Sequence, residues 1–189
     1  MLETLLHLDQ ELFLFLNGMH NGFFDFVMFW VSQTAVWIPL WIYFIYLIIK
    51  LYKPKSYWII LGLIVAVAAA DFSSVHLFKN VFERLRPCHN AEIASLVHLV
   101  NNHCGGQYGF VSSHSANMFA IATFMFLALR KRFPLSYIPL FLWASVISYS
   151  RIYLGVHYPG DVIGGALLGS FMAVLFWWVL GRSGLLVKV

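Results

Sequence analysis

Three short segments of the 189-residue chain contain side chains that could bind a phosphate group and attack it. Together they supply three cations, two histidines, two serines and one carboxylate. These residues are Lys79, Arg86, Ser112, Ser113, His114, Arg151, His157 and Asp161. Ionisable side chains are costly at membrane depth, so such a set in an apolar chain indicates function.

The cations of the first and third segments are suited to hold a phosphate. Lys79 and Arg86 are seven residues apart, so they share one face if the segment is helical, and Pro87 would then end the helix. Arg151 would approach from another segment. Arg can bind two phosphate oxygens at once, whereas Lys acts as a point charge. These three side chains are therefore predicted to bind a phosphoryl group.

The histidines are predicted to carry the chemistry. His157 and Asp161 are four residues apart, and Asp161 could accept a hydrogen bond from one ring nitrogen of His157, making the other a better nucleophile. Pro159 and Gly160 between them indicate the start of a helix, with His157 just outside it. His114 could protonate the departing oxygen. We therefore predict a nucleophile at His157, an orienting carboxylate at Asp161 and a general acid at His114.

Two serines stand where a helix is expected to begin. Free N–H groups and the helix dipole make such an end an anion site. We assign Ser112 to the phosphate, and we leave Ser113 between phosphate binding and a role as helix N-cap.

Two further polar residues lie in the hydrophobic run that precedes Lys79. Asp71 could pair with a motif cation, bond a serine or stay protonated, and we expect packing or a supporting role rather than direct catalysis. His76 is expected to be structural.

The composition indicates an integral membrane protein. Hydrophobic residues make up 61% of the chain and charged residues 11%, against about 25% charged residues in soluble domains. The length suits a single all-α domain over residues 1–189. The net charge of +4 does not imply nucleic-acid binding, because the basic residues are divided between membrane-edge loops and the motifs. No cleavable signal peptide is expected, because the N-terminus lacks a basic region.

Five hydrophobic runs are predicted to span a bilayer, which requires about 20 residues each. They are residues 35–51, 57–78, 113–129, 135–152 and 162–180. Residues 1–20 are predicted to form an amphipathic helix that lies in the membrane interface. Residues 23–31 are either a second interfacial piece or the start of the first span, so six spans is the alternative count.

The positions of the basic residues predict the orientation. Under the five-span layout, eight positive residues follow the first, third and fifth spans and so share one side. They are Lys50, Lys53, Lys55, Arg130, Lys131, Arg132, Arg182 and Lys188. Because Lys and Arg in short loops mark the cytoplasm, the C-terminus is expected inside, and the N-terminus and all three motifs outside.

The longest polar stretch, residues 87–111, is predicted to be an external loop. It contains both cysteines, Cys88 and Cys104, for which an oxidising exterior favours a disulfide. Free thiols and a metal site with nearby histidines are the alternatives, although the spacing matches no standard zinc pattern. Four glycines at the start of the last span are expected to allow close helix packing. They are Gly160, Gly164, Gly165 and Gly169.

The three segments together resemble the signature of the type 2 phosphatidic acid phosphatase (PAP2) superfamily, which reads K-x6-R-P, P-S-G-H and S-R-x5-H-x3-D. Residues 79–87 match the first part and residues 150–161 match the third. The resemblance covers about residues 20–180, and the order and spacing of the parts make it highly specific.

The second part of the signature departs from the family pattern. Val111 and Ser113 stand where the family has Pro and Gly, while Ser112 and His114 are kept. A serine at position 113 retains the backbone N–H that the family offers to the phosphate, but its Cβ could crowd the site. This departure puts the rate or the preferred substrate in question more than the reaction class.

The resemblance implies a phosphatase of lipid phosphates or diphosphates that uses no metal and no cofactor. By matching position, His157 would form a phosphohistidine, Asp161 would orient it, and His114 would be the general acid. The phosphate would be held by Lys79, Arg86, Ser112, Ser113 and Arg151.

The expected partners are membrane lipids and a lipid phosphate substrate in a bacterial inner membrane. Small bacterial members of the family act on undecaprenyl diphosphate, phosphatidylglycerophosphate or lipid A, and on the resemblance alone undecaprenyl diphosphate is our preferred expectation. A phosphotransferase and a catalytically inactive lipid-binding scaffold are the rival functions. The intact histidines and cations argue against the scaffold.

Overall fold

The computed structural model describes residues 2–185, and this part of the chain is helical with no named strand. The longer helices are α1 (Leu2–Gly18), α2 (Gly22–Ser32), α3 (Ile38–Tyr52), α4 (Ser56–Ser73), α6 (Ser113–Leu129), α7 (Tyr137–Tyr153) and α8 (Pro159–Arg182). The predicted all-α class is confirmed.

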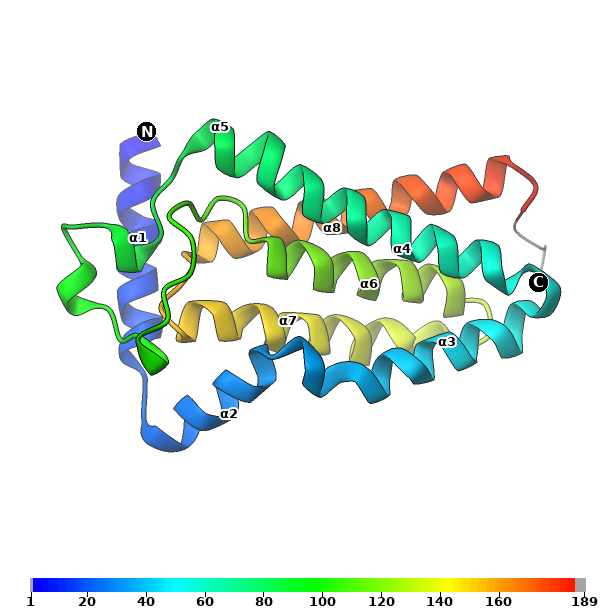
Figure 1. Cartoon of the computed structure of the whole chain (residues 1–189), viewed down its shortest axis with the longest axis horizontal. Helices are drawn as coiled ribbons and strands as arrows, with labels where there is room; N and C mark the ends of the chain where they lie inside the picture. Colours follow the sequence, from blue (N-terminus) through cyan, green and yellow to red (C-terminus); the bar gives the residue numbers. More distant parts are fainter. Residues whose placement is uncertain (1, 186–189) are drawn as a thin grey trace.

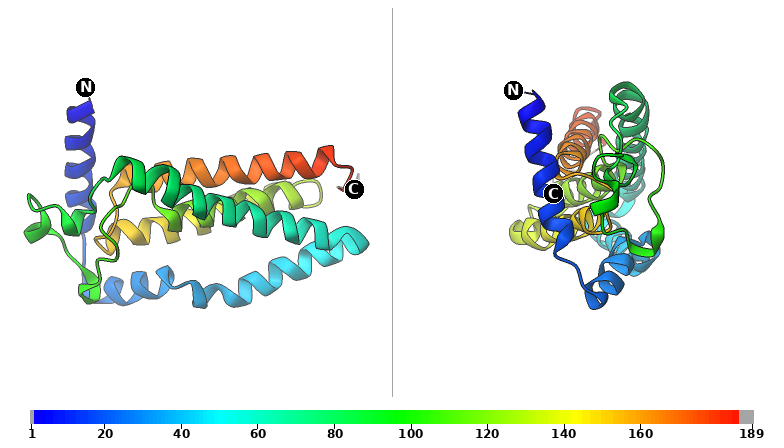
Figure 2. Two further views of the ribbon diagram at one scale, coloured as in Figure 1. Left: turned by 45° about the horizontal axis from the view of Figure 1, so that its top comes forward. Right: turned by 90° about the vertical axis from the view of Figure 1, so that its left-hand side faces the viewer.

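The molecule is an elongated bundle with one helix across its end. In Figure 1, α3, α4, α6, α7 and α8 follow the long axis, and α1 stands across one end. Figure 2 shows the same crossing from two other sides. The chain reverses between α3 and α4 through a short turn, Lys53–Lys55, so these two helices form a hairpin.

Apolar packing centres on α6, which is buried along most of its length. Glycines on α8 allow the two helices to touch. A Cβ atom at Gly165 would lie 2.4 Å from the carbonyl oxygen of Ser112, and one at Gly169 would lie 1.9 Å from that of Ala116. Small residues let helix backbones approach in this way, so the predicted packing role is confirmed at both positions.

By length and composition, two helical stretches among the described residues could cross a membrane. They are residues 34–82, which include the α3–α4 hairpin, and Pro159–Arg182. The bent pair Glu3–Gly18 and Gly22–Ser32, which meet at 115°, would make a third if it counted as one span, and Ser113–Leu129 is a shorter apolar helix. The five-span count therefore stays a prediction.

The N-terminal helix forms as predicted and docks on the end of the bundle. Phe13 is fully buried and contacts Tyr158 edge to face at 5.4 Å. The side-chain amide of Asn17 donates to the carbonyl oxygens of Tyr153 and His98. Large apolar side chains elsewhere on α1 remain exposed, including Leu5 at 59%. One face of α1 thus packs on the bundle, and another is free to meet lipid.

The structure corrects one expectation about the first motif, because Lys79 and Arg86 do not share a helical face. After α4 the chain forms a π-helical turn, Ser74–Lys79, and a last short turn, α5 (Asn80–Phe82). Glu83 then adopts a left-handed conformation with φ 46°, which ends the helix four residues before Pro87. Arg86 instead lies in an extended segment whose N–H donates to the carbonyl oxygen of Gln107.

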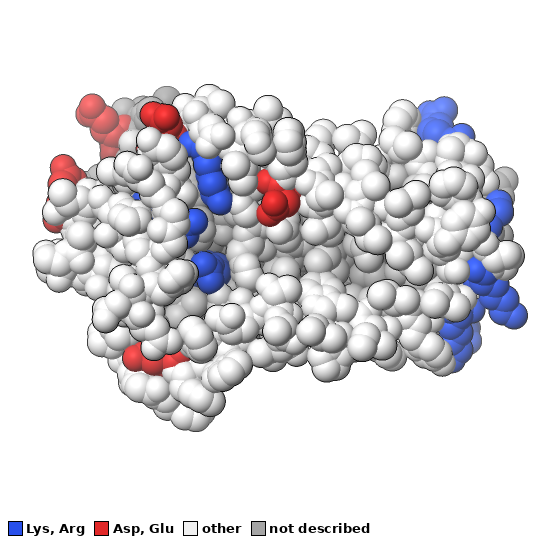
Figure 3. All heavy atoms as spheres, in the orientation of Figure 1, with Lys and Arg blue, Asp and Glu red and all other residues white. Residues whose placement is uncertain are grey.

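Charged side chains are separated along the bundle. Figure 3 shows Lys and Arg gathered at the end away from α1, and most acidic groups at the α1 end. A second basic group lies within a hollow on the side of the molecule, nearer the α1 end. Lys188, which the sequence predicts to lie at the same end as the other basic residues, is outside the described residues.

Candidate active site

A buried histidine–aspartate pair lies at the start of α8. The side chains of His157 and Asp161 are 3% and 0% exposed, and Nδ1 of His157 lies 3.3 Å from Oδ2 of Asp161. Because an ionised carboxylate only accepts hydrogen bonds, this contact assigns the ring proton to Nδ1. Nε2 then carries the free lone pair. The α8 helix begins at Pro159, as predicted, so Asp161 sits in its first turn, where the helix dipole stabilises an anion.

His157 lies in the loop between α7 and α8, outside both helices. Burial lowers the pKa of His157 to about 3, against the opposing effect of Asp161, and the charges of Arg86 and Arg151 lower it further. The imidazole is therefore neutral at physiological pH, as a nucleophilic histidine must be.

Asp161 has further partners that the sequence analysis did not include. Its Oδ2 accepts a hydrogen bond from the backbone N–H of Tyr158 at 3.0 Å. Its Oδ1 accepts one from Nη1 of Arg84 at 2.9 Å, and Nη2 of Arg84 donates to Asp9 of α1 at 2.8 Å. A buried carboxylate needs a counter-charge and donors, and Arg84 supplies the counter-charge. Sequence spacing could not reveal the two contacts of Arg84, because 77 residues separate it from Asp161 and 75 from Asp9.

Lys79 is held in place by Ser113 of α6, which also contacts Ser74. Its Nζ donates to Oγ of Ser113 at 2.6 Å, and Oγ of Ser74 donates to the same oxygen at 2.6 Å. An ammonium group has three donors, so Lys79 keeps capacity for a phosphate. The Ser113 hydroxyl, absent from the family pattern, thus orients a predicted phosphate-binding cation.

The two serines at the start of α6 have different partners. Ser112 is the N-cap of α6, and its Oγ accepts from the N–H of Ser115 at 3.4 Å. Ser113 is the first helical residue and contacts Lys79. The cap role left open for Ser113 therefore belongs to Ser112. The N–H of Ser112 also donates to the carbonyl oxygen of Asp161 at 2.9 Å, which ties the second motif to the third.

Arg86 is fixed by backbone carbonyl groups rather than by acidic side chains. Its Nε donates to Tyr108 at 3.3 Å, and its Nη1 donates to Val156 at 3.4 Å and to Cys104 at 3.5 Å. The residue is only 8% exposed. Neutral partners hold the guanidinium without neutralising it, so its positive charge remains available to an anion.

Arg151 and His114 complete the predicted set. Nη1 of Arg151 contacts the hydroxyl of Ser32, and its buried Nε has no hydrogen-bond partner within residues 2–185. The charge of Arg151 acts on both His114 and His157. A buried guanidinium with a free donor is suited to receive an anionic ligand. Hydrogen bonds join Lys79 to Ser113 and Ser112 to Asp161, so the three motifs meet where α6 and α8 begin. Figure 3 shows basic atoms inside a hollow nearer the α1 end.

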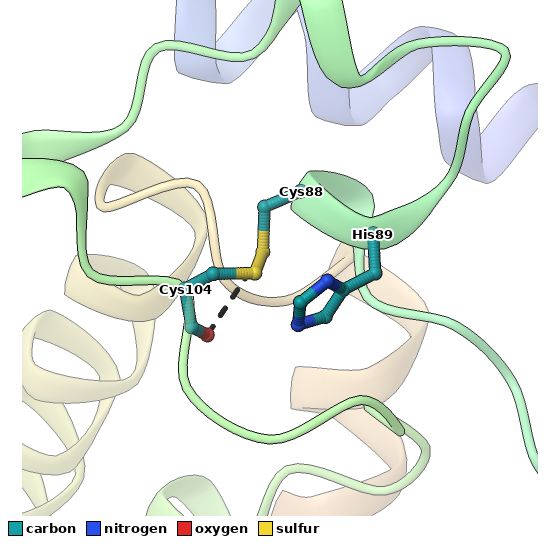
Figure 4. Close-up of side chains that lie close together, drawn as sticks. All are labelled: Cys88, His89 and Cys104. Atoms are coloured by element: carbon teal, nitrogen blue, oxygen red, sulfur yellow. Dashed lines mark hydrogen bonds between the residues drawn. A yellow bond between two sulfur atoms is a disulfide. The ribbon is translucent and has the colours of Figure 1, made fainter.

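The external loop is closed by a disulfide. Cys88 and Cys104 are bonded, with their Cα atoms 6.0 Å apart, and Figure 4 shows the ring of His89 beside the bond. The three side chains are close enough to suggest a metal site. However, a disulfide sulfur is not the thiolate that binds zinc, so the grouping does not fit a metal in this state.

Asp71 and His76, the two further polar residues of the first motif region, have partners outside the catalytic pair. Asp71 accepts a hydrogen bond from the side-chain amide of Asn117 at 3.0 Å, rather than pairing with a cation or with a serine through its carboxylate. Nδ1 of His76 lies 3.0 Å from the carbonyl oxygen of Phe72. Neither contact joins Asp71 or His76 to the His157–Asp161 pair.

The matching family model is the PAP2 superfamily, over residues 56–184. The chain is 36% identical to a lipid A 4'-phosphatase of Bacteroides thetaiotaomicron, over 95% of this chain and 80% of that protein. It is 32% identical to a lipid A 4'-phosphatase of Porphyromonas gingivalis, over 89% and 71%. An undecaprenyl-diphosphatase of Sulfolobus acidocaldarius is 28% identical, over 88% and 76%.

A solved structure supports the same fold. The PAP2-type phosphatidylglycerolphosphate phosphatase of Bacillus subtilis superposes with a TM-score of 0.74, over 95% of this chain and 87% of that one, at 21% identity. The motif residues, their convergence and the extent of these matches agree with one another. The chain belongs to the PAP2 superfamily and is a membrane lipid phosphatase.

Proposed function

We propose that this phosphatase removes a phosphate monoester from a glycolipid of the lipid A type, through a phosphohistidine on His157. The observation that carries the mechanism is the buried His157–Asp161 pair, with the charges of Arg86 and Arg151 acting on His157. The substrate class is supported by the two relatives named lipid A 4'-phosphatases, at 36% and 32% identity. Undecaprenyl diphosphate, the expectation from the sequence, has weaker support in a relative at 28% identity.

In the first step, Nε2 of His157 attacks the phosphorus atom, and the bond from phosphorus to the lipid oxygen breaks. The departing oxygen takes a proton from His114 and leaves as the lipid alcohol. Asp161 stabilises the positive imidazole that forms, while Lys79, Arg86 and Arg151 hold the charge on the phosphoryl oxygens. His114 must therefore begin this step protonated, and substrate phosphate beside it favours that state.

In the second step, water attacks the phosphohistidine and gives one proton to His114. The N–P bond breaks, inorganic phosphate leaves, and His157 returns to its neutral form. Each residue thus ends as it began. Three cations supply the positive charge that a metal provides in other phosphatases, and we propose that turnover is independent of divalent ions.

We place the site at the outer face of a bacterial inner membrane, with the N-terminus outside and the C-terminus in the cytoplasm. The basic end of the bundle, opposite α1, supports this orientation. The basic hollow opens on the side of the molecule, so a lipid headgroup could enter from the bilayer while its acyl chains remain there.

The test is phosphate release by purified protein in detergent with EDTA present, with His157→Ala as the control. The panel contains lipid A, undecaprenyl diphosphate, phosphatidylglycerophosphate and phosphatidic acid. We expect lipid A to give the highest kcat/KM, and mass spectrometry of the product to show which phosphate was removed. Preference for another lipid would overturn the substrate assignment, and activity that needs a divalent ion would overturn the metal-free mechanism.

A further inference from the structure

Arg84 joins the catalytic aspartate to the N-terminal helix. Nη1 of Arg84 donates to Oδ1 of Asp161 at 2.9 Å, and Nη2 donates to Oδ2 of Asp9 at 2.8 Å. The guanidinium also lies over the ring of Tyr158, 4.1 Å from its centroid. Two carboxylates and an aromatic face therefore fix this side chain in three directions.

Asp9 of α1 contacts both Arg84 and the first turn of α8. Its Oδ1 accepts a hydrogen bond from the backbone N–H of Gly160 at 2.7 Å, while its Oδ2 receives Arg84. A Cβ at position 160 would lie 2.7 Å from Oδ2 of Asp9, so a larger residue there would displace the Asp9 carboxylate. A carboxylate of α1 is thus hydrogen-bonded to the first turn of α8, in which Asp161 lies.

The two oxygens of Asp161 divide their partners. Oδ2 faces His157 and the N–H of Tyr158, whereas Oδ1 faces Arg84. Because Asp161 is fully buried, removal of Arg84 would leave its Oδ1 without the cation that is hydrogen-bonded to it. The carboxylate would then be free to turn, and it would no longer hold the Nδ1 proton of His157 in a fixed position.

We propose that Arg84 and Asp9 are positioning residues for catalysis, and that α1 acts through them to hold the His157–Asp161 pair in its reactive geometry. Arg84 acts on Asp161, and Asp9 acts through Arg84 and Gly160. The proposal rests on the proposed function for its kinetic readout. It makes the N-terminal helix a part of the active site as well as a membrane-surface element.

The kinetic test compares Asp9→Asn, Arg84→Gln, Arg84→Lys and the double variant of Asp9→Asn with Arg84→Gln. Asparagine keeps an oxygen for Gly160 and replaces the charge that faces Arg84. The matched control is Glu11→Gln, which removes an exposed charge from the same helix. We expect kcat to fall about 10- to 100-fold in Arg84→Gln and about 10-fold in Asp9→Asn, with KM changed less than about twofold.

Further outcomes separate positioning from general damage. Arg84→Lys should recover part of the lost kcat, and the double variant should be no slower than Arg84→Gln, because Asp9 acts through Arg84. The Ki of inorganic phosphate should stay within about twofold of wild type, because the three phosphate-binding cations are intact. Unchanged kcat in both single variants, or additive losses in the double variant, would overturn the proposal.

A second readout needs no turnover and so separates this proposal from the proposed function. Proton NMR of 15N-histidine-labelled protein should show a downfield Nδ1–H resonance of His157 in wild type and in Glu11→Gln, and should lose it in Arg84→Gln. Loss of the resonance supports positioning even if no tested lipid is a substrate. A resonance unchanged in Arg84→Gln and Asp9→Asn would overturn it whatever the activity of the wild type.

Discussion

Gly109 lies against the catalytic pair, where even a methyl group would intrude. A Cβ at this position would be 2.9 Å from Oδ2 of Asp161 and 3.6 Å from Nδ1 of His157. The N–H of Gly109 donates to the carbonyl oxygen of Arg84 at 2.8 Å, which keeps the loop in place. The external loop therefore forms one wall of the His157–Asp161 pair.

Replacing Gly109 by alanine should slow catalysis with little effect on folding. The added methyl group would push Asp161 away from His157, and small misplacements of reacting groups cost about 10- to 100-fold in rate. The measurement is kcat for lipid A, with Gly106→Ala as the matched control, because a Cβ at position 106 meets nothing within 4 Å. Equal rates for the two variants would show that Gly109 has no such role.

The low pKa of His157 predicts its behaviour in acid. Since burial lowers that pKa to about 3, the imidazole should stay neutral from pH 7 to pH 5 in the folded protein. The 15N shifts of His157 in the unliganded protein, assigned with His157→Ala, would measure this. Titration with a midpoint near 6.5 would contradict it.

The same shift links His157 to stability. The unfolded chain binds this proton below about pH 6.5, whereas the folded chain does not until about pH 3. The contribution of a neutral His157 to the free energy of unfolding is therefore complete above about pH 6.5. It is lost progressively as the pH falls from about 6.5 to about 3.

The sequence predicted the residues of the site better than their supports. The eight motif residues could be named because their types and spacing already suggest phosphate chemistry. Arg84, Asp9 and Gly109 could not, because their roles come from contacts between segments far apart in the chain. The cap role of Ser112 has a similar origin, since a difference of one residue in the helix start decides which serine caps it.

At the scale of helices, the contact between α6 and α8 sets the position of both catalytic segments. Ser112 begins one helix and Asp161 begins the other, and a backbone hydrogen bond joins these two residues. Gly165 and Gly169, which follow Asp161 along α8, allow the backbones of α6 and α8 to touch. Close packing here is therefore a condition for the geometry of the site.

Gly169→Ala should destabilise the protein. Its Cβ would lie 1.9 Å from the carbonyl oxygen of Ala116, and overpacking of this kind costs about 1–3 kcal/mol. Thermal unfolding in detergent measures the effect, and Gly18→Ala is the control, because a Cβ at position 18 meets nothing within 4 Å. If both variants unfold at the wild-type temperature, the helices have more freedom than the structure indicates.

The helices themselves were largely predictable, but their ends were not. Apolar runs in the sequence correspond to α3, α4, α6, α7 and α8, because a membrane-spanning helix needs a continuous apolar surface. The π-helical turn Ser74–Lys79 and the left-handed Glu83 broke the expected helix before Arg86. Hydropathy carries no signal for either feature, so the position of Arg86 relative to Lys79 could not be predicted from the sequence.

At the scale of the whole molecule, charge is distributed so that the two ends of the bundle differ. Basic side chains follow α3, α6 and α8 at one end, and the motifs and the disulfide-closed loop lie at the other. Short-loop basic residues mark the cytoplasmic side, and a disulfide is stable in an oxidising compartment. Both features predict the same orientation.

Thiol labelling tests that orientation. In spheroplasts, a membrane-impermeant maleimide should label Glu92→Cys in the external loop at once, and should label Arg132→Cys between α6 and α7 only after the membrane is permeabilised. Both positions are exposed in the folded chain, so access depends on the side of the membrane. The reverse pattern would place the site in the cytoplasm.

The proposed mechanism requires a covalent phosphohistidine at His157, and this intermediate can be trapped. Wild-type protein mixed with 32P-labelled lipid A and quenched in alkali within milliseconds should carry label that survives base, is lost in acid and maps to the peptide containing His157. His157→Ala should carry none, and His114→Ala should form the intermediate slowly. If the wild type releases phosphate without such label, or if His157→Ala retains the label, the phosphohistidine mechanism is wrong.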